Sequence, residues 1–501
     1  MVRMGSVLAI VVALAVAVTG CGTKEEKVVI ADPVAEALAH APADAAALAV
    51  VATDTAAGPG AALARLGRRF PGIELLAGQA QATLGKRLGL DYATEIRPLL
   101  GHPLVLWSTD GSAERRFAAW VVRNGGKLGE LLAARERSGA LVAAPSLAGY
   151  ALSTRRGGGA YARRGPVLVS APDLAALRDV LRRRQAGRGQ WSPRLLRERG
   201  LGLPEGAVAR AALDARALVA RRGGRARRVP WIAALERAAV TITPEAGGLR
   251  VHARASTDPG ALAASDVPIA PGVEPPVTRG RGRLVAAVRD PQQSLRFARR
   301  VVDLLDPHRL DGLRRVEEVL SRFARVSVQD DLVERLSGSA TLTSRDGRTL
   351  TLRADLDDPE VTAGALDRLG TLARFGGPLA GLAGVDLGGI GIDAQDGGRY
   401  LVTQDGRLLV ALAVVDGALV ASTDPDADLA AAARAPAAPR PPTAGAFRAT
   451  VDAGLLKDVL AARLGLSGLG RAALAPVGDL IVTARGEREF LDAQFILPIA
   501  R

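Results

Sequence analysis

The chain has few of the residues that cross-link small domains or build common active sites. It contains one cysteine, four histidines and 3% aromatic residues among 501 positions. A single cysteine cannot form an intramolecular disulfide bond, so stability must come from packing by alanine, leucine and valine. The histidines have no second His or Cys at zinc-ligand spacing, so we expect partly exposed structural residues and neither metal nor cofactor. They are His40, His102, His252 and His308.

Motifs for catalysis are missing as well. Ser339 lacks the Gly-x-Ser-x-Gly pattern of a nucleophile elbow, and Gly85-Lys86 lacks the glycine-rich loop of a phosphate site. The acids of 424–428 alternate as in a calcium loop, but the required glycine and glutamate are absent, so we expect a helix cap there. We therefore predict no enzymatic activity. The alternative is an envelope hydrolase whose catalytic residues are dispersed along the chain.

The N-terminus carries an export signal. A short basic start containing Arg3 precedes the unbroken apolar run Val7–Val18, which is shorter than the roughly 20 residues of a membrane-spanning helix and typical of a cleaved signal peptide. The tetrapeptide Val18-Thr19-Gly20-Cys21 resembles the lipobox of bacterial lipoproteins. An ordinary secretory signal and an uncleaved anchor helix are the alternatives.

The lipobox resemblance implies a cellular location and a membrane partner. Residues 1–20 would be removed as the signal peptide, and the Cys21 thiol would carry a lipid. Acyl chains bind stably to a bilayer when two or more are present. We therefore expect a protein on the extracytoplasmic side of the cell membrane, anchored through Cys21, with residues 21–43 forming the lipidated N-terminus and tether.

Positive charge is abundant but not arranged for nucleic-acid binding. The formal net charge of +14 loses one with Arg3, leaving +13, and arginine supplies most of it. The clusters Arg182–Arg184 and Arg221–Arg228 lack the interleaved aromatic residues of a stacking surface. We expect no nucleic-acid partner, but a solvated basic surface near anionic lipid headgroups.

The body repeats one plan twice. Five pairs of segments recur in the same order, four of them at offsets between 236 and 241 residues. The pairs are 44–54 with 280–290, 100–104 with 337–341, 150–170 with 400–422, 210–215 with 448–453, and 239–242 with 480–483. We therefore predict two tandem copies, 44–256 and 280–501, joined by a Pro/Gly-rich linker at 257–279.

Each copy mixes helices with antiparallel strands, which predicts the α+β class. Asp-Gly pairs suit tight hairpin turns, and Asp173 and Asp424 precede helical stretches as expected N-caps. The turns are Asp110-Gly111, Asp346-Gly347, Asp405-Gly406 and Asp416-Gly417. Apolar residues three and four apart predict helices at Ala61–Arg69, Ala80–Leu88, Leu174–Arg184, Leu295–Leu305 and Leu310–Phe323.

The order of segments, including Pro42–Val51 and Leu88–Trp107, resembles the bacterial envelope proteins grouped as domain of unknown function 3352. The resemblance supports the two-part α+β layout and implies no activity. We expect a non-enzymatic binding or scaffolding role. Its target would be an envelope protein or an apolar ligand, the latter in a groove between the copies.

Overall fold

The structure is a computed structural model that describes residues 30–500 apart from short gaps. The gaps are 71–77, 79–80, 82–84, 86–89, 113, 188, 383–389, 396–397, 439–444 and 465–467. The predicted signal peptide, its Val18, Thr19 and Gly20, and the lipidation residue Cys21 lie outside the described residues. None of the helices in the described part of the chain has the length and apolar character that a membrane span requires.

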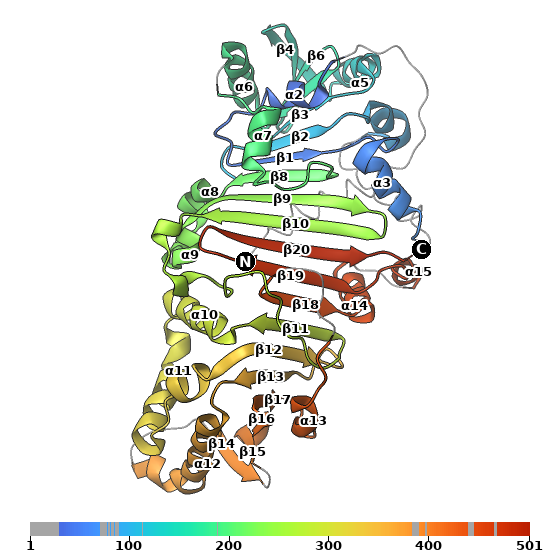
Figure 1. The fold of residues 1–501 in the computed structure, drawn as a ribbon. Helices are drawn as coiled ribbons and strands as arrows, with labels where there is room; N and C mark the ends of the chain where they lie inside the picture. The colour runs from blue at the N-terminus through green and yellow to red at the C-terminus, as the bar shows by residue number, and fades with distance from the viewer. Residues whose placement is uncertain are drawn as a thin grey trace.

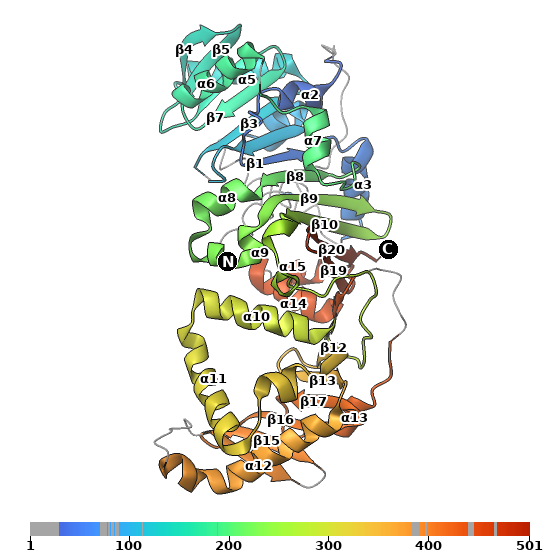
Figure 2. The same cartoon turned by 60° about the vertical axis from the view of Figure 1, so that its left-hand side comes forward.

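All twenty strands of the described chain belong to one antiparallel sheet, which runs the length of an elongated molecule (Figures 1 and 2). The first half supplies β1 (Ala47–Val51), β2 (Leu104–Ser108), β3 (Arg116–Val121), β4 (Leu141–Leu147), β5 (Tyr150–Arg155), β6 (Ala160–Arg164), β7 (Val167–Ala171), β8 (Ala209–Asp214), β9 (Leu235–Glu245) and β10 (Gly248–Thr257). The second half supplies β11 (Leu284–Arg289), β12 (Leu336–Ser344), β13 (Thr351–Leu356), β14 (Ile390–Gln395), β15 (Arg399–Gln404), β16 (Arg407–Val415), β17 (Ala418–Ser422), β18 (Phe447–Val451), β19 (Leu480–Gly486) and β20 (Phe490–Pro498).

The pairings give one strand order for the first half and the same order for the second. The first half runs β4-β5-β6-β7-β3-β2-β1-β8-β9-β10. The second runs β14-β15-β16-β17-β13-β12-β11-β18-β19-β20. β10 and β20 pair with each other, so the halves join edge to edge. The described chain therefore combines helices with one large antiparallel sheet.

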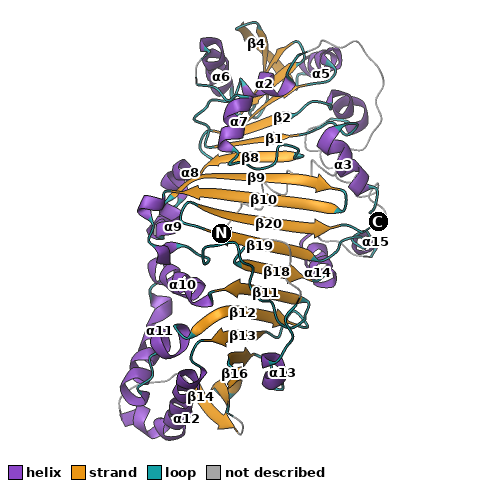
Figure 3. Ribbon diagram, viewed as in Figure 1, coloured by secondary structure: helices purple, strands orange, loops and turns teal. Residues whose placement is uncertain are grey.

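Helices cover the sheet and its margins (Figure 3). In Figure 1, α8 to α11 follow the left side of the sheet, and α3, α14 and α15 lie to the right. The helices are α2 (Pro33–Leu38), α3 (Gly58–Gly67), α5 (Gly125–Arg137), α6 (Leu174–Ala186), α7 (Pro193–Arg199), α8 (Ala215–Arg222), α9 (Pro230–Ala233), α10 (Pro291–Leu305), α11 (His308–Val319), α12 (Pro359–Leu382), α13 (Leu429–Ala433), α14 (Ala453–Leu464) and α15 (Leu469–Ala472).

Most of the local predictions are confirmed. All four Asp-Gly pairs fall between consecutive antiparallel strands, and in Asp405-Gly406 both residues have positive φ, of 51° and 75°, as a type I′ turn requires. Helices α3, α6, α10 and α11 occupy the predicted ranges within a few residues. The helix predicted at 80–88 falls largely outside the described residues.

One of the two predicted N-caps is wrong. Asp173 caps α6 by accepting a hydrogen bond from the amide of Ala176. The cap of α13 is Asp428, which accepts from Ala431, whereas Asp424 accepts from Asp426 in the preceding turn. Both aspartates suit either place, because a short carboxylate can bond a nearby amide in a turn as well as at a helix start.

The largest core lies in the first half. It packs α2 and α6 against the sheet and includes Leu48, Val105, Val169 and Leu177, all buried. Smaller clusters line the second half, around Leu366 and Tyr400 and around Ala413 and Val420. Alanine, valine and leucine dominate these clusters, which agrees with the scarcity of aromatic residues.

A buried ionic cluster lies where the halves meet. Asp492 on β20 is 4% exposed and accepts hydrogen bonds from His252, at 2.9 Å, and from the Nε of Arg254, at 2.8 Å, both on β10. Burial tends to raise the pKa of Asp492, but the hydrogen bonds and charges of His252 and Arg254 outweigh it and hold that pKa below its ordinary value. The ionised carboxylate therefore links the two edge strands.

Candidate functional site

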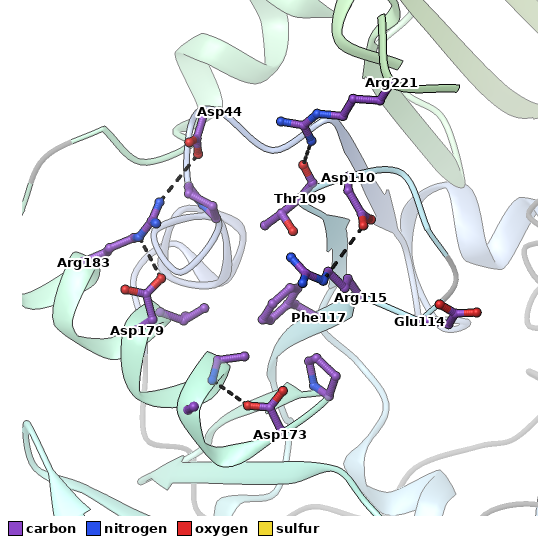
Figure 4. Close-up of a pocket in the computed structure, with 15 residues that line it drawn as sticks. Asp44, Thr109, Asp110, Glu114, Arg115, Phe117, Asp173, Asp179, Arg183 and Arg221 are labelled. Atoms are coloured by element: carbon purple, nitrogen blue, oxygen red, sulfur yellow. Dashed lines mark hydrogen bonds and ion pairs between the residues drawn. The ribbon is translucent and has the colours of Figure 1, made fainter. Parts of the chain in front are cut away.

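An open cleft of about 710 Å³ lies in the first half (Figure 4). Four parts of the chain line it: the segment between α2 and β1, the β2–β3 hairpin, one face of α6 with the residues just before it, and α8. Its lining residues are Pro42, Asp44, Thr109, Asp110, Glu114, Arg115, Phe117, Pro172, Asp173, Ala175, Ala176, Asp179, Val180, Arg183 and Arg221. Segments more than a hundred residues apart therefore build one concave surface.

The hairpin wall owes its shape to Asp110. The carboxylate accepts hydrogen bonds from the amide of Ser112, at 2.7 Å, and from the hydroxyl of Ser108, at 3.2 Å. Such side-chain bonds to nearby backbone fix a tight turn. The guanidinium of Arg115 lies 4.0 Å from the same carboxylate and is 70% exposed, so its charge is available at the rim.

The opposite wall is one face of α6. Its N-cap Asp173 fixes where the helix begins. Asp179, six residues later, pairs with Arg183 at 3.0 Å, and Arg183 also lies 3.8 Å from Asp44. All three side chains are more than half exposed, so these ion pairs stabilise the fold little and can exchange for contacts with a ligand.

Arg221 closes the third side. Its guanidinium donates a 2.6 Å hydrogen bond to the carbonyl of Thr109, which ties α8 to the hairpin (Figure 4). A carbonyl acceptor carries no net charge, so the positive charge of Arg221 is not neutralised. The floor is apolar: Phe117 is 6% exposed and stacks on Trp107, with ring centroids 5.4 Å apart.

The cleft therefore combines an aromatic floor with a charged rim. Its lining contains five carboxylates and three guanidinium groups, an acidic balance on a chain of net charge +14. This lining favours a ligand that presents positive groups around an apolar body. Three of these carboxylates have structural partners: Asp110 in the hairpin turn, Asp173 at the start of α6, and Asp179 in its ion pair with Arg183. Such engaged carboxylates favour binding over acid–base chemistry.

A second, smaller pocket of about 170 Å³ lies nearby. It is lined by Arg199, Leu213, Asp214, Arg216, Glu236 and Arg237. Its charges are already engaged in part: Arg216 pairs with Glu236 at 2.6 Å, and Asp214 caps α8. Both of these pockets belong to the first half, and neither lies between the halves.

The structure does not bring the four histidines together. His308 is exposed and pairs with Asp311, and His252 joins the ionic cluster at β10–β20. His102 is partly exposed; its carbonyl accepts from Thr53 and Trp120. No group of three or more His, Asp or Glu side chains that could hold a metal ion occurs within the described ranges.

His40 departs from the expectation of partial exposure. It is 2% exposed, and burial, followed by the charge of Arg184, lowers its pKa to about 3. The neutral ring donates from Nδ1 to the carbonyl of Glu36 and accepts at Nε2 from the Tyr150 hydroxyl. No pattern in the sequence indicated this burial, because the partner Tyr150 is 110 residues away.

Sequence reasoning did not identify the cleft. It singled out Asp173 as a helix cap, Asp110 as a turn residue, and Arg183 and Arg221 as members of arginine clusters. Each of these local roles holds, but nothing in the sequence places the four segments side by side.

Comparisons with known proteins add little. No protein-family model matches the chain, and no curated protein matches it. Among solved structures, crystal form III of TP0453 is similar at 9% identity, with a TM-score of 0.27 over 44% of this chain and 79% of that chain. Crystal form I gives 10% identity and the same TM-score over 46% and 80%. So distant a likeness carries no argument about function.

Proposed function

We propose that this chain is an exported lipoprotein, anchored by a lipid on Cys21, whose body has a non-enzymatic binding or scaffolding role on the outer side of the membrane. The observation that carries the proposal is the position of the single cysteine. It follows Val18-Thr19-Gly20 directly behind the apolar run Val7–Val18, where a lipoprotein is acylated.

The proposal is tested by metabolic labelling with palmitate in a bacterial host. The wild-type chain and a Thr23→Ser variant, which leaves the lipobox intact, should incorporate label and fractionate with membranes. Cys21→Ser should incorporate none. If the wild-type chain takes up no label, and Cys21→Ser stays with the membranes, the anchor and the location built upon it are both wrong.

We also propose that the body arose by tandem duplication. The repeated strand order supports it, and so does the register. Ala47 pairs with Ser108, and Leu284 pairs with Ser344; these positions differ by 237 and 236, the offsets that relate the sequence segments. The resemblance to domain of unknown function 3352 is part of the same proposal and adds no activity.

We infer that binding takes place in the cleft of the first half. The occupant would be a segment of an envelope protein that presents basic side chains to the rim and an apolar side chain to Phe117. An apolar, lipid-like ligand is the second chemistry to test. The edge-to-edge joining through β10 and β20 favours the cleft over a groove between the copies.

Paired variants test the cleft. Asp44→Asn with Asp179→Asn removes two exposed carboxylates from the rim, and Asp405→Asn with Asp426→Asn removes two exposed carboxylates from turns in the second half. Proteins and lipids recovered from detergent-solubilised envelope are quantified for each. We expect at least one envelope protein to be recovered with the unaltered chain and with the Asp405/Asp426 control variant, but not with the Asp44/Asp179 rim variant. If both double variants recover the same proteins and lipids in equal amounts, the cleft is not the binding site. If the rim variant loses a lipid and no protein, the apolar ligand is favoured.

A further inference from the structure

The connection between β8 and β9 carries a concentration of positive charge that the fold does not require. Residues 215–234 contain six arginines and no acidic residue. The connection between β18 and β19, at the same place in the second half's strand order, spans 452–479 and contains Lys457, Arg463 and Arg471 against Asp452, Asp458 and Asp479. The net charges are +6 and zero, so the arginines are not needed to bridge two such strands.

The structure holds these arginines on a fixed, exposed turn. Helix α8 leads into a 3-10 turn at Gly224–Arg228, and the next residue, Val229, is 1% exposed and anchors the turn in the protein. Arg221, Arg225, Arg227 and Arg228 are all exposed. The turn is already ordered and presents several guanidinium groups together. Binding a ligand there therefore requires no further ordering of its backbone.

These four charges are not neutralised within the described part of the chain, where none of them forms an ion pair with a carboxylate. Arg221 and Arg227 donate to the carbonyls of Thr109 and Ala220. Helix α10, which packs against the turn, adds no unpaired positive charge, because its Arg296, Arg299 and Arg300 pair with Glu334, Glu317 and Asp266. The charge that can attract a polyanion is therefore that of the four exposed arginines before α10.

The turn also lies on the part of the molecule that leads to the N-terminus. Arg221 lines the same cleft as Pro42 and Asp44, which follow α2 directly. Eight residues lie between Cys21 and Ile30, where the described chain begins, and the nine steps from one to the other span at most about 30 Å. A lipid on Cys21 would thus leave this region within reach of the bilayer surface.

We propose that the exposed arginines of the β8–β9 connection bind the headgroups of anionic phospholipids and form a second membrane contact beside the Cys21 lipid. The inference rests on the proposed location outside the membrane. A basic residue near an anionic bilayer strengthens binding roughly five-fold. Three of them together would therefore change the partition coefficient by about 100-fold.

The test uses a chain that begins at Gly22, because every described element lies after that point and the anchor would otherwise dominate binding. Binding to phosphatidylcholine vesicles with and without phosphatidylglycerol is measured by co-sedimentation. The test variant carries Arg225→Gln, Arg227→Gln and Arg228→Gln. The control variant carries Arg345→Gln, Arg348→Gln and Arg407→Gln, three exposed arginines of the second half that form no ion pair with a carboxylate of the described residues. Circular dichroism confirms that both variants fold.

We expect the unaltered chain to bind only the vesicles with phosphatidylglycerol, the test variant to bind about 100-fold more weakly, and the control variant to bind as before. Equal weakening in both variants would mean that overall charge alone is responsible, which overturns the proposal. No binding by the unaltered chain to the vesicles with phosphatidylglycerol overturns it too. Because this chain lacks Cys21, the result is independent of the palmitate experiment.

Discussion

At the scale of single residues, the scarcity of histidine leaves each one with a distinct environment. His40 is enclosed between Glu36 and Tyr150. The carboxylate of Glu36 also pairs with Arg184, at an oxygen–nitrogen distance of 2.7 Å. A guanidinium beside a buried imidazole makes protonation costly. The hydrogen bond of Tyr150 to His40 therefore depends on a neutral ring.

His40 should make the protein sensitive to acid. Its pKa is near 6.5 in the unfolded chain and about 3 in the folded protein, so the unfolded state binds the proton first. Stability is complete above about pH 6.5 and falls toward pH 3, by up to about 1.4 kcal/mol per pH unit. His40→Gln should flatten this slope in urea titrations across that range. His308→Gln, at an exposed site, should not; a slope that persists in His40→Gln contradicts the assignment.

At the scale of elements, much of the local structure could be predicted from the sequence. An Asp-Gly pair at 405–406 or 416–417 fixes its own turn through backbone φ, so the hairpin can be inferred without knowledge of the rest. The caps were harder. Asp424 and Asp428 both lie before α13. Which of them caps the helix, and which lies in the preceding turn, depends on where the chain leaves β17.

The two aspartates before α13 can be told apart by substitution. Asp428→Ala removes the hydrogen bond to the amide of Ala431 and should destabilise the helix by about 1 kcal/mol. Asp424→Ala loses only a turn contact with Asp426 and should leave the helix nearly unchanged. Hydrogen exchange of the α13 amides measures both. A larger effect at Asp424 would restore the original sequence-based assignment.

At the scale of the whole molecule, the sequence predicted two copies but not how they meet. Segment matches at constant offset carry no information on which edges pair. The β10–β20 pairing brings Gly248–Ser256 against Phe490–Pro498, residues about 240 apart. Neither strand's own sequence indicates which strand it pairs with. The cleft escaped prediction for the same reason, since Asp44, Phe117, Asp179 and Arg221 come together only in the folded chain.

The strands that join the halves include one close approach between backbones, at the end of their pairing. β10–β20 is the only strand pairing between the halves in the described chain, and it begins at Gly248, where an added Cβ would lie 2.2 Å from the carbonyl oxygen of Leu497. A carbonyl within a paired strand cannot move aside, so Gly248→Ala should push β20 away and destabilise the protein by about 1–3 kcal/mol. It should also speed hydrogen exchange in β10 and β20. The neighbouring Gly247 has nothing within 4 Å of its added Cβ, so Gly247→Ala should be nearly neutral. If both substitutions lower the thermal midpoint alike, the close contact does not hold the halves together.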